Sequence, residues 1–413
     1  MSRPPTPSDH EHADADGFGI EHLPYGVFST PDSPARCRPG VRIGSNVLDI
    51  GALARARGLD FAPCFGGDSL NPFLAAGPAI WTTARGWLQE QLSDPAYPDV
   101  LSQHLSPISD VRLHLPIRVA DYVDFYASEQ HASNIGAMLR PGSPALTPNW
   151  KHLPIGYHGR SSTIVVSDTA VVRPQGQRKG PDEPAPTFGP TRKLDIEAEL
   201  AFIVGGATRP GQVVAVDDAA DHIFGVVLFN DWSARDIQAW EYVPLGPFLG
   251  KSFASSMAAW ITPMEALRAA HHPLPTQDPE PLPYLRGSAG SNVGLDIEME
   301  IWLNGKVISR PPYASMYWSP AQMLAHLSVN GAAISDGDVF ASGTTSGVDR
   351  ETRGSLMELS WNGAEPLHLA DGSTRTFLED GDTVTIGASA PTESGRRMTL
   401  ASVSGTVVEA HQG

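Results

Sequence analysis

The sequence predicts a mainly β fold with some α-helix, in a mixed and mostly antiparallel architecture. Asn-Gly and Asp-Gly turn dipeptides recur, and apolar or alternating runs such as 224–229 and 383–386 lie beside them. Helical patterns are too few for a doubly wound fold. One helix is clear, because Ser319 fits its N-cap, Pro320 its first helical position and Gly331 the position just past its end.

The chain divides into three predicted parts, which are a disordered tail (1–16), a small β-rich unit (17–117) and a larger unit (118–413). The small unit opens with short strands broken by Pro and Gly, followed by a helical stretch near 82–92. These strands are predicted at residues 26–29, 41–43 and 47–50. Residues with reactive side chains are sparse there, so we expect a structural role for the small unit. The larger unit carries the chemistry.

The composition excludes several classes of protein. Hydrophobic residues make up 41% of the chain, which is enough for a sizeable core. The net charge of −17 argues against a nucleic-acid partner and against an anionic membrane surface. Two cysteines, Cys37 and Cys64, form no disulfide framework, and we find no secretory signal and no apolar run of about 18 residues. We therefore expect a soluble, cytoplasmic protein.

An acidic segment at 194–200 is the first candidate for a functional site. If it is a strand, Asp195, Glu197 and Glu199 share one face, where they repel one another unless water or a cation screens them. A near copy at 295–301 has the same pattern of residues. A solvated outer strand explains either segment as well as a metal site does.

A second candidate lies where the apolar run 224–229 ends. Asp231 follows this run and would lie at the tip of a buried strand, or else cap the helix that comes next. On that helix, Arg235 and Gln238 are three residues apart and share a face. A guanidinium and an amide aimed together suit a developing oxyanion, although an exposed helix surface is the alternative.

The loop 246–252 resembles a phosphate-binding loop but is one residue short between its glycines. It also carries Pro247, where such a loop needs a backbone N–H donor, so nucleotide binding is rejected. A buried Lys251 on this glycine-containing turn would instead be an electrostatic catalyst or an anion holder.

Two further segments offer a base and its partner. If 121–131 is helical, Asp124 and His131 lie on one face, so that one can hold a metal while the other transfers a proton. Residues 356–359 alternate, which sets Glu358 opposite its apolar neighbours, where it can orient an imidazole. The alternatives are a structural histidine and a surface salt bridge.

Together these segments resemble the fumarylacetoacetate hydrolase family. The resemblance spans nearly all of the chain except its first residues. The matching stretches are 23–30, 121–131, 148–160, 230–238, 240–253 and 341–358. It implies a small SH3-like barrel at 17–117 and a catalytic β-sandwich or roll of the family's own type at 118–413, assembled as a homodimer. The implied activity is metal-dependent hydrolysis of a C–C bond of 4-fumarylacetoacetate, a small anionic diketo acid, in tyrosine and phenylalanine degradation.

The resemblance also implies a role for each candidate residue. Calcium or magnesium binds Asp124, Glu197, Glu199 and Asp231, so the first acidic segment is chosen over its copy. His131 activates water and is oriented by Glu358, while Arg235, Gln238 and Lys251 stabilise the oxyanion. The substrate contacts are Tyr126, Arg140, Tyr157, Gln238, Tyr242 and Thr344. Ala254-Ser255 replaces the family's usual Gly-Thr at a secondary cation site that includes Lys251.

Two other functions remain open from the sequence. A related lyase, either a hydratase or a decarboxylase, would share the carboxylate ligands but would not need the pair of His131 and Glu358, which therefore favours hydrolysis. A non-catalytic metal-binding protein would have no reason to keep Arg235, Gln238 and Lys251 beside that pair. The absence of thiolates and of a histidine cluster disfavours zinc in all three cases.

Overall fold

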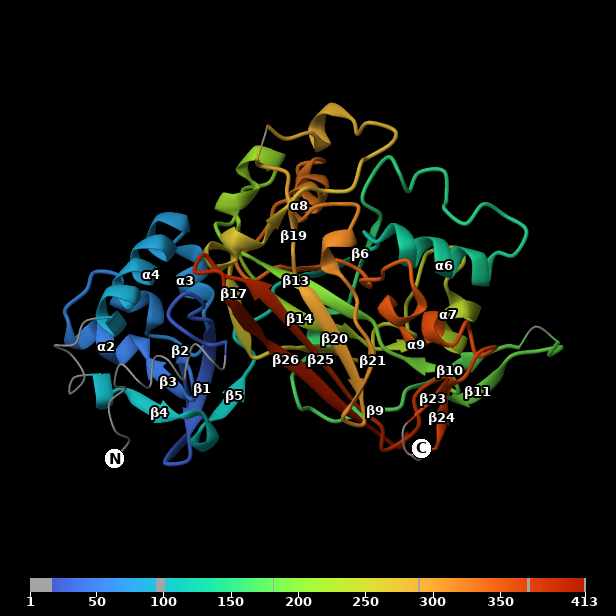
Figure 1. Ribbon diagram of the computed structural model, residues 1–413, viewed down its shortest axis with the longest axis horizontal. Helices are drawn as coiled ribbons and strands as arrows, with labels where there is room; N and C mark the ends of the chain where they lie inside the picture. Colours follow the sequence, from blue (N-terminus) through green and yellow to red (C-terminus); the bar gives the residue numbers. More distant parts are fainter. Residues whose placement is uncertain (1–16, 94–100, 181, 289, 370–371, 412–413) are drawn as a thin grey trace.

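The computed structural model describes residues 17–93, 101–180, 182–288, 290–369 and 372–411. The tail predicted at 1–16 lies outside these residues. Strands form the body of the molecule, and shorter helices lie around it (Figure 1). The predicted fold class is therefore confirmed, while the SH3-like form of the small unit stays a prediction.

The small N-terminal unit is rich in strands, as predicted, and also contains several helices. Its strands are β1 (Tyr25–Thr30), β2 (Ser33–Ile43), β3 (Asn46–Asp49), β4 (Leu105–Pro107) and β5 (Arg112–His114), and its α-helices are α2 (Ile50–Ala56), α3 (Asn71–Ala75) and α4 (Pro78–Ser93). Helix α2 follows β3 directly because the Asp49 carboxylate caps it, accepting a hydrogen bond from the Ala52 N–H at 2.8 Å. Ile50 thus begins a helix and does not end a strand.

One large sheet runs through both units. The order of its main path is β4-β3-β2-β1-β17-β14-β13-β22-β6-β7, with β5, β8 and β16 beside it. Its further strands are β17 (Trp260–Pro263), β14 (Ile223–Asp231), β13 (Ala198–Val204), β22 (Val339–Ala341), β6 (Tyr122–Phe125), β7 (Gly156–His158), β16 (Ser255–Met257) and β8 (Ile164–Val166). Strand β1 joins β17 by pairing Gly26 with Trp260. A Cβ on Gly26 would come within 2.5 Å of the Trp260 ring, so this junction requires glycine.

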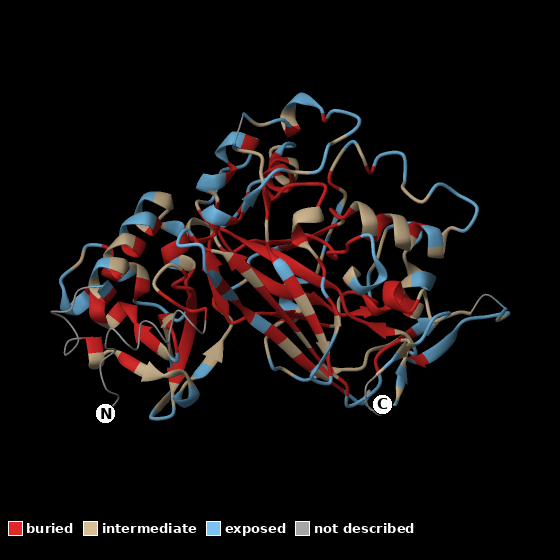
Figure 2. Ribbon diagram, in the orientation of Figure 1, coloured by how far each residue is buried: buried red, intermediate tan, exposed pale blue. Residues whose placement is uncertain are grey.

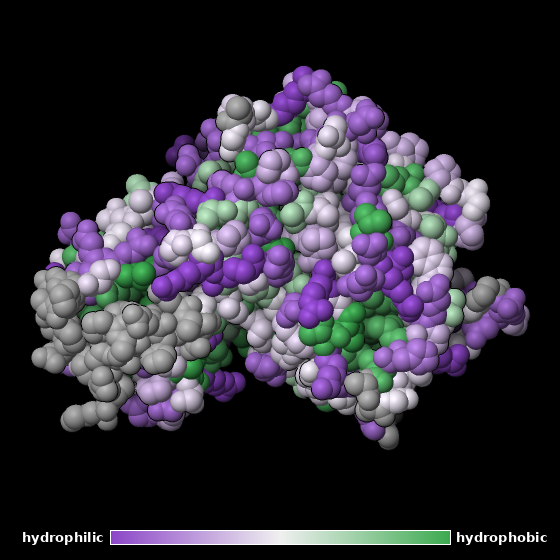
Figure 3. Space-filling model, in the orientation of Figure 1, coloured by the Kyte–Doolittle hydropathy of each residue, from purple (hydrophilic) through white to green (hydrophobic). Residues whose placement is uncertain are grey.

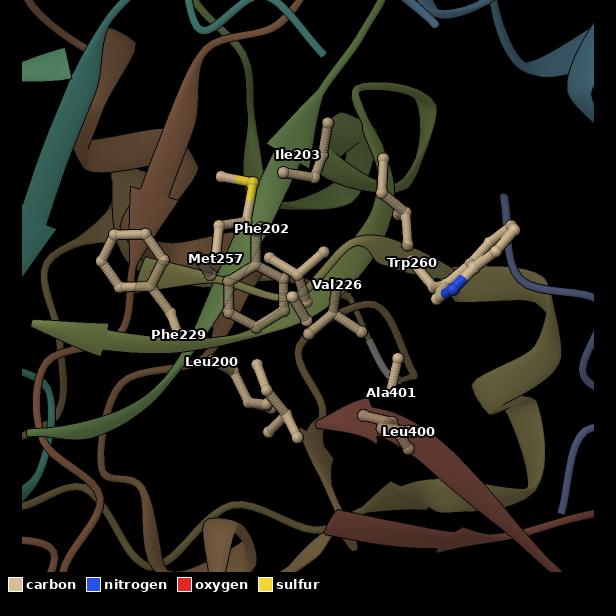
Figure 4. Packing of buried hydrophobic residues seen from close by; sticks show 14 of the residues in the cluster. Leu200, Phe202, Ile203, Val226, Phe229, Met257, Trp260, Leu400 and Ala401 are labelled. Atoms are coloured by element: carbon tan, nitrogen blue, oxygen red, sulfur yellow. The ribbon is translucent and has the colours of Figure 1, made fainter. Parts of the chain in front are cut away.

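A second sheet packs against the first and encloses the core. Its order is β21-β20-β25-β26-β9, formed by β21 (Lys306–Ser309), β20 (Glu298–Leu303), β25 (Thr383–Pro391), β26 (Arg397–Val408) and β9 (Val171–Val172). Buried residues alternate with exposed or half-buried ones along much of β26, whereas every residue of β13 and β14 is buried (Figure 2). Leu200 and Val226 of the first sheet lie toward Leu400 of β26 (Figure 4). The strands that carry the acidic residues are therefore held on both faces by packed apolar side chains.

The remaining elements surround the ends of the strands. The α-helices here are α6 (Glu129–Leu139), α7 (Arg235–Glu241), α8 (Pro320–Ser328) and α9 (Leu356–Leu359). Short strand pairs are β10 (Gln175–Arg178) with β11 (Thr187–Pro190), β12 (Leu194–Asp195) with β15 (Ser233–Ala234), β18 (His271–His272) with β19 (Gly294–Leu295), and β23 (Leu367–His368) with β24 (Thr374–Arg375). Helix α8 begins where predicted, because Ser319 and Gln322 form a capping box.

The outer surface on the side drawn in Figure 3 is mainly polar. Hydrophilic side chains cover most of the face shown in Figure 3, and apolar areas are smaller. Among the described residues, no helix combines the length and the apolar character needed to cross a membrane.

Candidate active site

Four buried carboxylates meet at one end of neighbouring strands. Asp231 ends β14, Glu199 lies on the adjacent β13, and Asp124 lies on β6, which pairs with β22 next to β13. Glu197 immediately precedes β13. One oxygen from each carboxylate lies within 4.8 Å of the others. The structure therefore brings together the four residues proposed from the sequence as metal ligands.

The acidic segment differs in shape from the continuous strand that we expected. It is broken at Ile196 and Glu197, between β12 and β13, so Asp195 is not part of the carboxylate cluster. A solvated strand is also wrong here, because Asp195 and Glu199 are fully buried.

The copy of this segment faces outward. Glu298 pairs with Arg397 at 2.9 Å, and Glu300 pairs with Arg310 at 2.8 Å, in partly or fully exposed ion pairs. The solvated interpretation therefore holds for the copy alone.

The cluster has an unbalanced negative charge. Lys251 contacts Glu197 and lies 2.6 Å from Asp231 Oδ2, but Asp124 and Glu199 pair with no cationic side chain within the described parts of the chain. Asp124 Oδ1 and Glu199 Oε1 are buried and lack a hydrogen-bond partner there. Two unpaired carboxylates fit a divalent cation that prefers oxygen ligands.

The pKa values reflect the same imbalance. Burial, and then the charge of neighbouring carboxylates, raises the pKa of Asp124 and of Glu199 well above their usual values. Burial also opposes ionisation of Glu197, but Lys251, Arg235 and His131 outweigh it and lower the pKa of that carboxyl. Positive charge is therefore supplied on one side of the cluster and missing on the other.

Asp231 does not cap the helix that follows it. Helix α7 has Ala234 at its N-cap and no side-chain cap. The Asp231 carboxylate instead accepts hydrogen bonds from Tyr157 at 3.1 Å and from Ser255 at 2.9 Å, besides its contact with Lys251. The capping alternative is therefore wrong, and Asp231 belongs to the cluster.

A buried histidine and glutamate pair lies beside the carboxylates. His131 Nδ1 is 2.6 Å from Glu358 Oε2, and His131 Nε2 is 3.7 Å from Glu197 Oε1. The helix considered for 121–131 is wrong, because this segment is the strand β6 followed by the start of α6. Ser128 caps α6 and accepts a hydrogen bond from the His131 N–H. Asp124 and His131 thus meet through tertiary structure and not through helical spacing.

Glu358 lies on the short helix α9, so the alternating strand expected at 356–359 is wrong. Ser355 caps this helix, accepting from the Glu358 N–H and donating to Glu358 Oε2 at 2.8 Å. The pattern Ser-x-x-Glu is the sequence signature of a capping box and could have revealed this helix. Ser346 and Asn134 also donate to the carboxylate, at 3.0 and 2.9 Å, so Glu358 is an interior residue and not part of a surface salt bridge.

Arg235 and Gln238 share one face of α7, as predicted. Arg235 Nη1 donates to Gln238 Oε1 at 3.2 Å, and Arg235 Nη2 lies 2.8 Å from Glu197 Oε1. Arg235 is buried, so an exposed helix surface is not its environment. Its Nε donates to Asp195 at 2.8 Å, a contact that sequence reasoning missed.

The predicted substrate contacts lie at different depths around this centre. The ring of Tyr126 meets the His131 ring edge-on at 5.4 Å, and buried Thr344 has a hydroxyl without a partner in the described chain. Tyr242 is the C-cap residue that follows α7. Arg140 is the C-cap residue that follows α6, and its side chain donates to the Ala145 carbonyl at 2.9 Å.

The residues of the predicted second cation site are also buried. Ser255 is the first residue of β16, Ala254 precedes it, and Lys251 lies in the turn before them. The Ser255 hydroxyl already donates to Asp231 at 2.9 Å. Cation binding at these three residues stays a prediction.

A buried acid cluster, a histidine–glutamate pair and two buried cations in one place define the active centre of an enzyme. The comparisons with known proteins agree. The protein-family model described as fumarylacetoacetate (FAA) hydrolase C-terminal matches residues 121–408, and the family model described as fumarylacetoacetase N-terminal matches residues 21–116. The chain belongs to the fumarylacetoacetate hydrolase family.

Its relatives are similar over most of their length. The chain is 46% identical to the fumarylacetoacetase of Arabidopsis thaliana, over 89% of this chain and 90% of that protein. It is 45% identical to the fumarylacetoacetase of Homo sapiens, over 91% and 92%. A solved fumarylacetoacetate hydrolase from Exiguobacterium antarcticum shares the fold, with a TM-score of 0.54 and 18% identity over 94% of this chain and all of that one.

We expect Glu199→Gln to weaken cation binding by at least roughly 10-fold, because one of the two unpaired carboxylates is lost and even the loss of an outer-shell partner typically costs roughly 10- to 100-fold. Titration calorimetry with magnesium and with calcium measures this change. Glu300→Gln, at the equivalent position of the outward-facing copy, is the control and should bind like the wild type. Equal affinities of both variants would contradict a metal site at the cluster.

Proposed function

We propose that this chain hydrolyses a C–C bond of 4-fumarylacetoacetate, giving fumarate and acetoacetate, as the last step of tyrosine and phenylalanine degradation. The observation that carries this proposal is the buried pair of His131 and Glu358, with His131 Nε2 3.7 Å from the carboxylate cluster. The identity of 43–46% to eight curated fumarylacetoacetases, over about nine-tenths of each chain, supports the same substrate.

His131 is the proposed general base. A proton on Nδ1, donated to Glu358, leaves the lone pair of Nε2 directed toward the cluster, where it can accept a proton from water. Burial opposes ionisation of Glu358, but His131 and the hydrogen bonds from Asn134 and Ser355 lower the pKa of that carboxyl overall. An ionised Glu358 stabilises the imidazolium that forms when water attacks the carbonyl.

Arg235, Gln238 and Lys251 are the proposed stabilisers of the resulting oxyanion. Both cationic side chains are buried and held by carboxylates, so they need little reorganisation when charge develops. Each such donor is worth roughly 10²- to 10³-fold in rate. Collapse of the intermediate then breaks the C–C bond and releases acetoacetate as its enolate.

Asp124, Glu197, Glu199 and Asp231 would hold the cation, which we propose to be calcium or magnesium. When bound, such an ion supplies a Lewis acid for the oxygens of the diketone and of the leaving enolate. Lys251, Ala254 and Ser255 are proposed as a secondary cation site, through backbone carbonyl and hydroxyl oxygens.

The substrate is an anion, and its proposed contacts are one cationic side chain, three tyrosines and the polar side chains of Gln238 and Thr344. Arg140 would bind a carboxylate of the diketo acid through charge-assisted hydrogen bonds. Tyr126, Tyr157, Gln238, Tyr242 and Thr344 would line the rest of the site. The unpartnered hydroxyl of Thr344 supports this assignment, because a buried donor without a partner is costly.

We further propose that the protein is a cytoplasmic homodimer. Within each chain, the boundary between the two domains is proposed to lie between residues 117 and 118. Cys37 and Cys64 are both free, which suits a reducing compartment. Large apolar side chains are exposed in the loop after α7, where Leu245 is 96% and Phe248 59% exposed. Side chains of this kind support association between chains.

Incubation with fumarylacetoacetate tests the function directly. We expect the ultraviolet absorbance of the substrate to disappear, fumarate and acetoacetate to form in equal amounts, and a chelator to stop the reaction. A product that keeps all of the substrate's carbon or loses carbon dioxide would indicate a lyase, and an unchanged substrate would indicate a non-catalytic protein.

His131→Ala tests the base. We expect turnover to fall by roughly 10²- to 10⁴-fold, because general-base catalysis is lost, while cation and substrate binding stay close to wild type. Turnover is followed by absorbance and binding by calorimetry, with exposed His368→Ala as the control. Near-normal hydrolysis by His131→Ala would refute the base assignment.

The mass in solution tests the assembly. Light scattering should give twice the 44.1 kDa of one chain. A single-chain mass at micromolar concentration would contradict the homodimer.

A further inference from the structure

Asp195 is a fully buried carboxylate for which the proposed reaction has no role. It lies on β12, just outside the carboxylate cluster, and has an exposure of 0%. Its two oxygens accept four hydrogen bonds and donate none. Oδ1 accepts from the backbone N–H groups of Ile196 at 2.8 Å and Leu356 at 2.7 Å. Oδ2 accepts from Arg235 Nε at 2.8 Å and from the Met357 N–H at 3.1 Å.

These contacts join two parts of the catalytic machinery that are far apart in sequence. Arg235 lies at the start of α7, whereas Leu356 and Met357 are the two residues before Glu358 on α9. The Asp195 carboxylate therefore binds both the guanidinium of Arg235, the proposed oxyanion donor, and the backbone next to Glu358, which is hydrogen-bonded to His131. The backbone of Asp195 is itself fixed, because β12 pairs with β15 immediately before Arg235.

We propose that Asp195 is a positioning residue that fixes the Arg235 guanidinium relative to Glu358. Through these two residues, Asp195 fixes the position of the proposed oxyanion donors relative to the proposed base, His131. With Nε held by Asp195, Arg235 Nη1 is directed to Gln238 and Nη2 to the edge of the cluster at Glu197. The hydrogen bonds of Asp195 given above reach neither the proposed substrate contacts nor the cluster of four carboxylates. Asp195 acts through Arg235 and α9.

The carboxylate is required here because four donors converge on it. In Asp195→Asn, the amide oxygen could still accept from Ile196 and Leu356, but the NH₂ group would face the N–H groups of Arg235 and Met357. Two donors cannot share a hydrogen bond, so the guanidinium would turn away from its present position. The side-chain volume is almost unchanged, so packing around the site is preserved.

This inference rests on the proposed hydrolysis and is tested by steady-state kinetics with fumarylacetoacetate. We expect Asp195→Asn to lower kcat by roughly 10²- to 10³-fold with little change in KM, because an oxyanion forms only in the transition state. A role in folding alone would lower the apparent kcat only in proportion to the folded fraction. The kcat is therefore referred to the concentration of folded protein, measured by circular dichroism and by the unfolding transition. Asp296→Asn, at the equivalent position of the acidic copy, is the matched control and should keep wild-type kinetics.

A double-mutant cycle with Arg235→Met shows whether Asp195 acts through Arg235. If it does, Asp195→Asn should add no more than about twofold to the loss of kcat caused by Arg235→Met alone. If Asp195→Asn does not fold, Asp195→Glu takes its place in the cycle, since it keeps the charge but displaces the oxygens by one methylene. The same lack of additivity is expected.

Two results would overturn the inference while leaving the proposed function standing. One is a kcat of Asp195→Asn within about threefold of an active wild type, and the other is losses that multiply fully in the double variant. A wild-type protein that does not consume fumarylacetoacetate would overturn the proposed function and this inference together.

Discussion

The burial of four carboxylates within 4.8 Å of one another is the constraint that the rest of the site serves. A buried ion costs several kcal/mol even after relaxation, and each further like charge adds to the cost. Lys251 and Arg235 offset part of it at Glu197 and Asp231. The cost of burying the charges of Asp124 and Glu199 is not offset by a cationic side chain in the described residues, so a bound divalent cation would stabilise the cluster.

Such a cluster persists only on a rigid support. Asp231, Glu199 and Asp124 lie on strands of one sheet, and β13 and β14 are buried on both faces (Figures 2 and 4). Dense packing leaves the carboxylates little room to separate and relieve their repulsion. The apolar core thus contributes to chemistry by holding charges where they would not remain by themselves.

The polar groups around the cluster form a second, connected network. Glu358 accepts from His131, Asn134, Ser346 and Ser355, and Asp195 accepts from Arg235 and from the backbone of α9. Every donor in this network is buried or half-buried, where a hydrogen bond is stronger and a missing partner is more costly. The proposed base and the proposed oxyanion donors therefore share contacts with one network of buried polar groups.

The sequence alone determined the fold class, the buried strand ending at Asp231, the shared face of Arg235 and Gln238, and the capped helix α8. These features depend on periodicity and on capping within a few residues, which are local properties. Its errors in secondary structure came from local signals that the predictions did not use. Ser128 and Ser355 begin helices at residues that we had assigned differently, and the strand at 194–200 breaks at Ile196 and Glu197.

The two acidic segments show most clearly what only tertiary structure decided. Both have the sequence pattern Leu-Asp-Ile-Glu-x-Glu, and both are interrupted within it. The first breaks after Asp195, between β12 and β13, and the second breaks one position earlier, after Leu295, between β19 and β20. The two segments thus share an interrupted strand, although the interruption is shifted by one residue. Glu199 lies in the interior beside Asp124, whereas Glu300 pairs with Arg310 at the surface. No pattern within seven residues distinguishes them, because the free energy of a carboxylate depends on the charges and the water that the folded chain places around it.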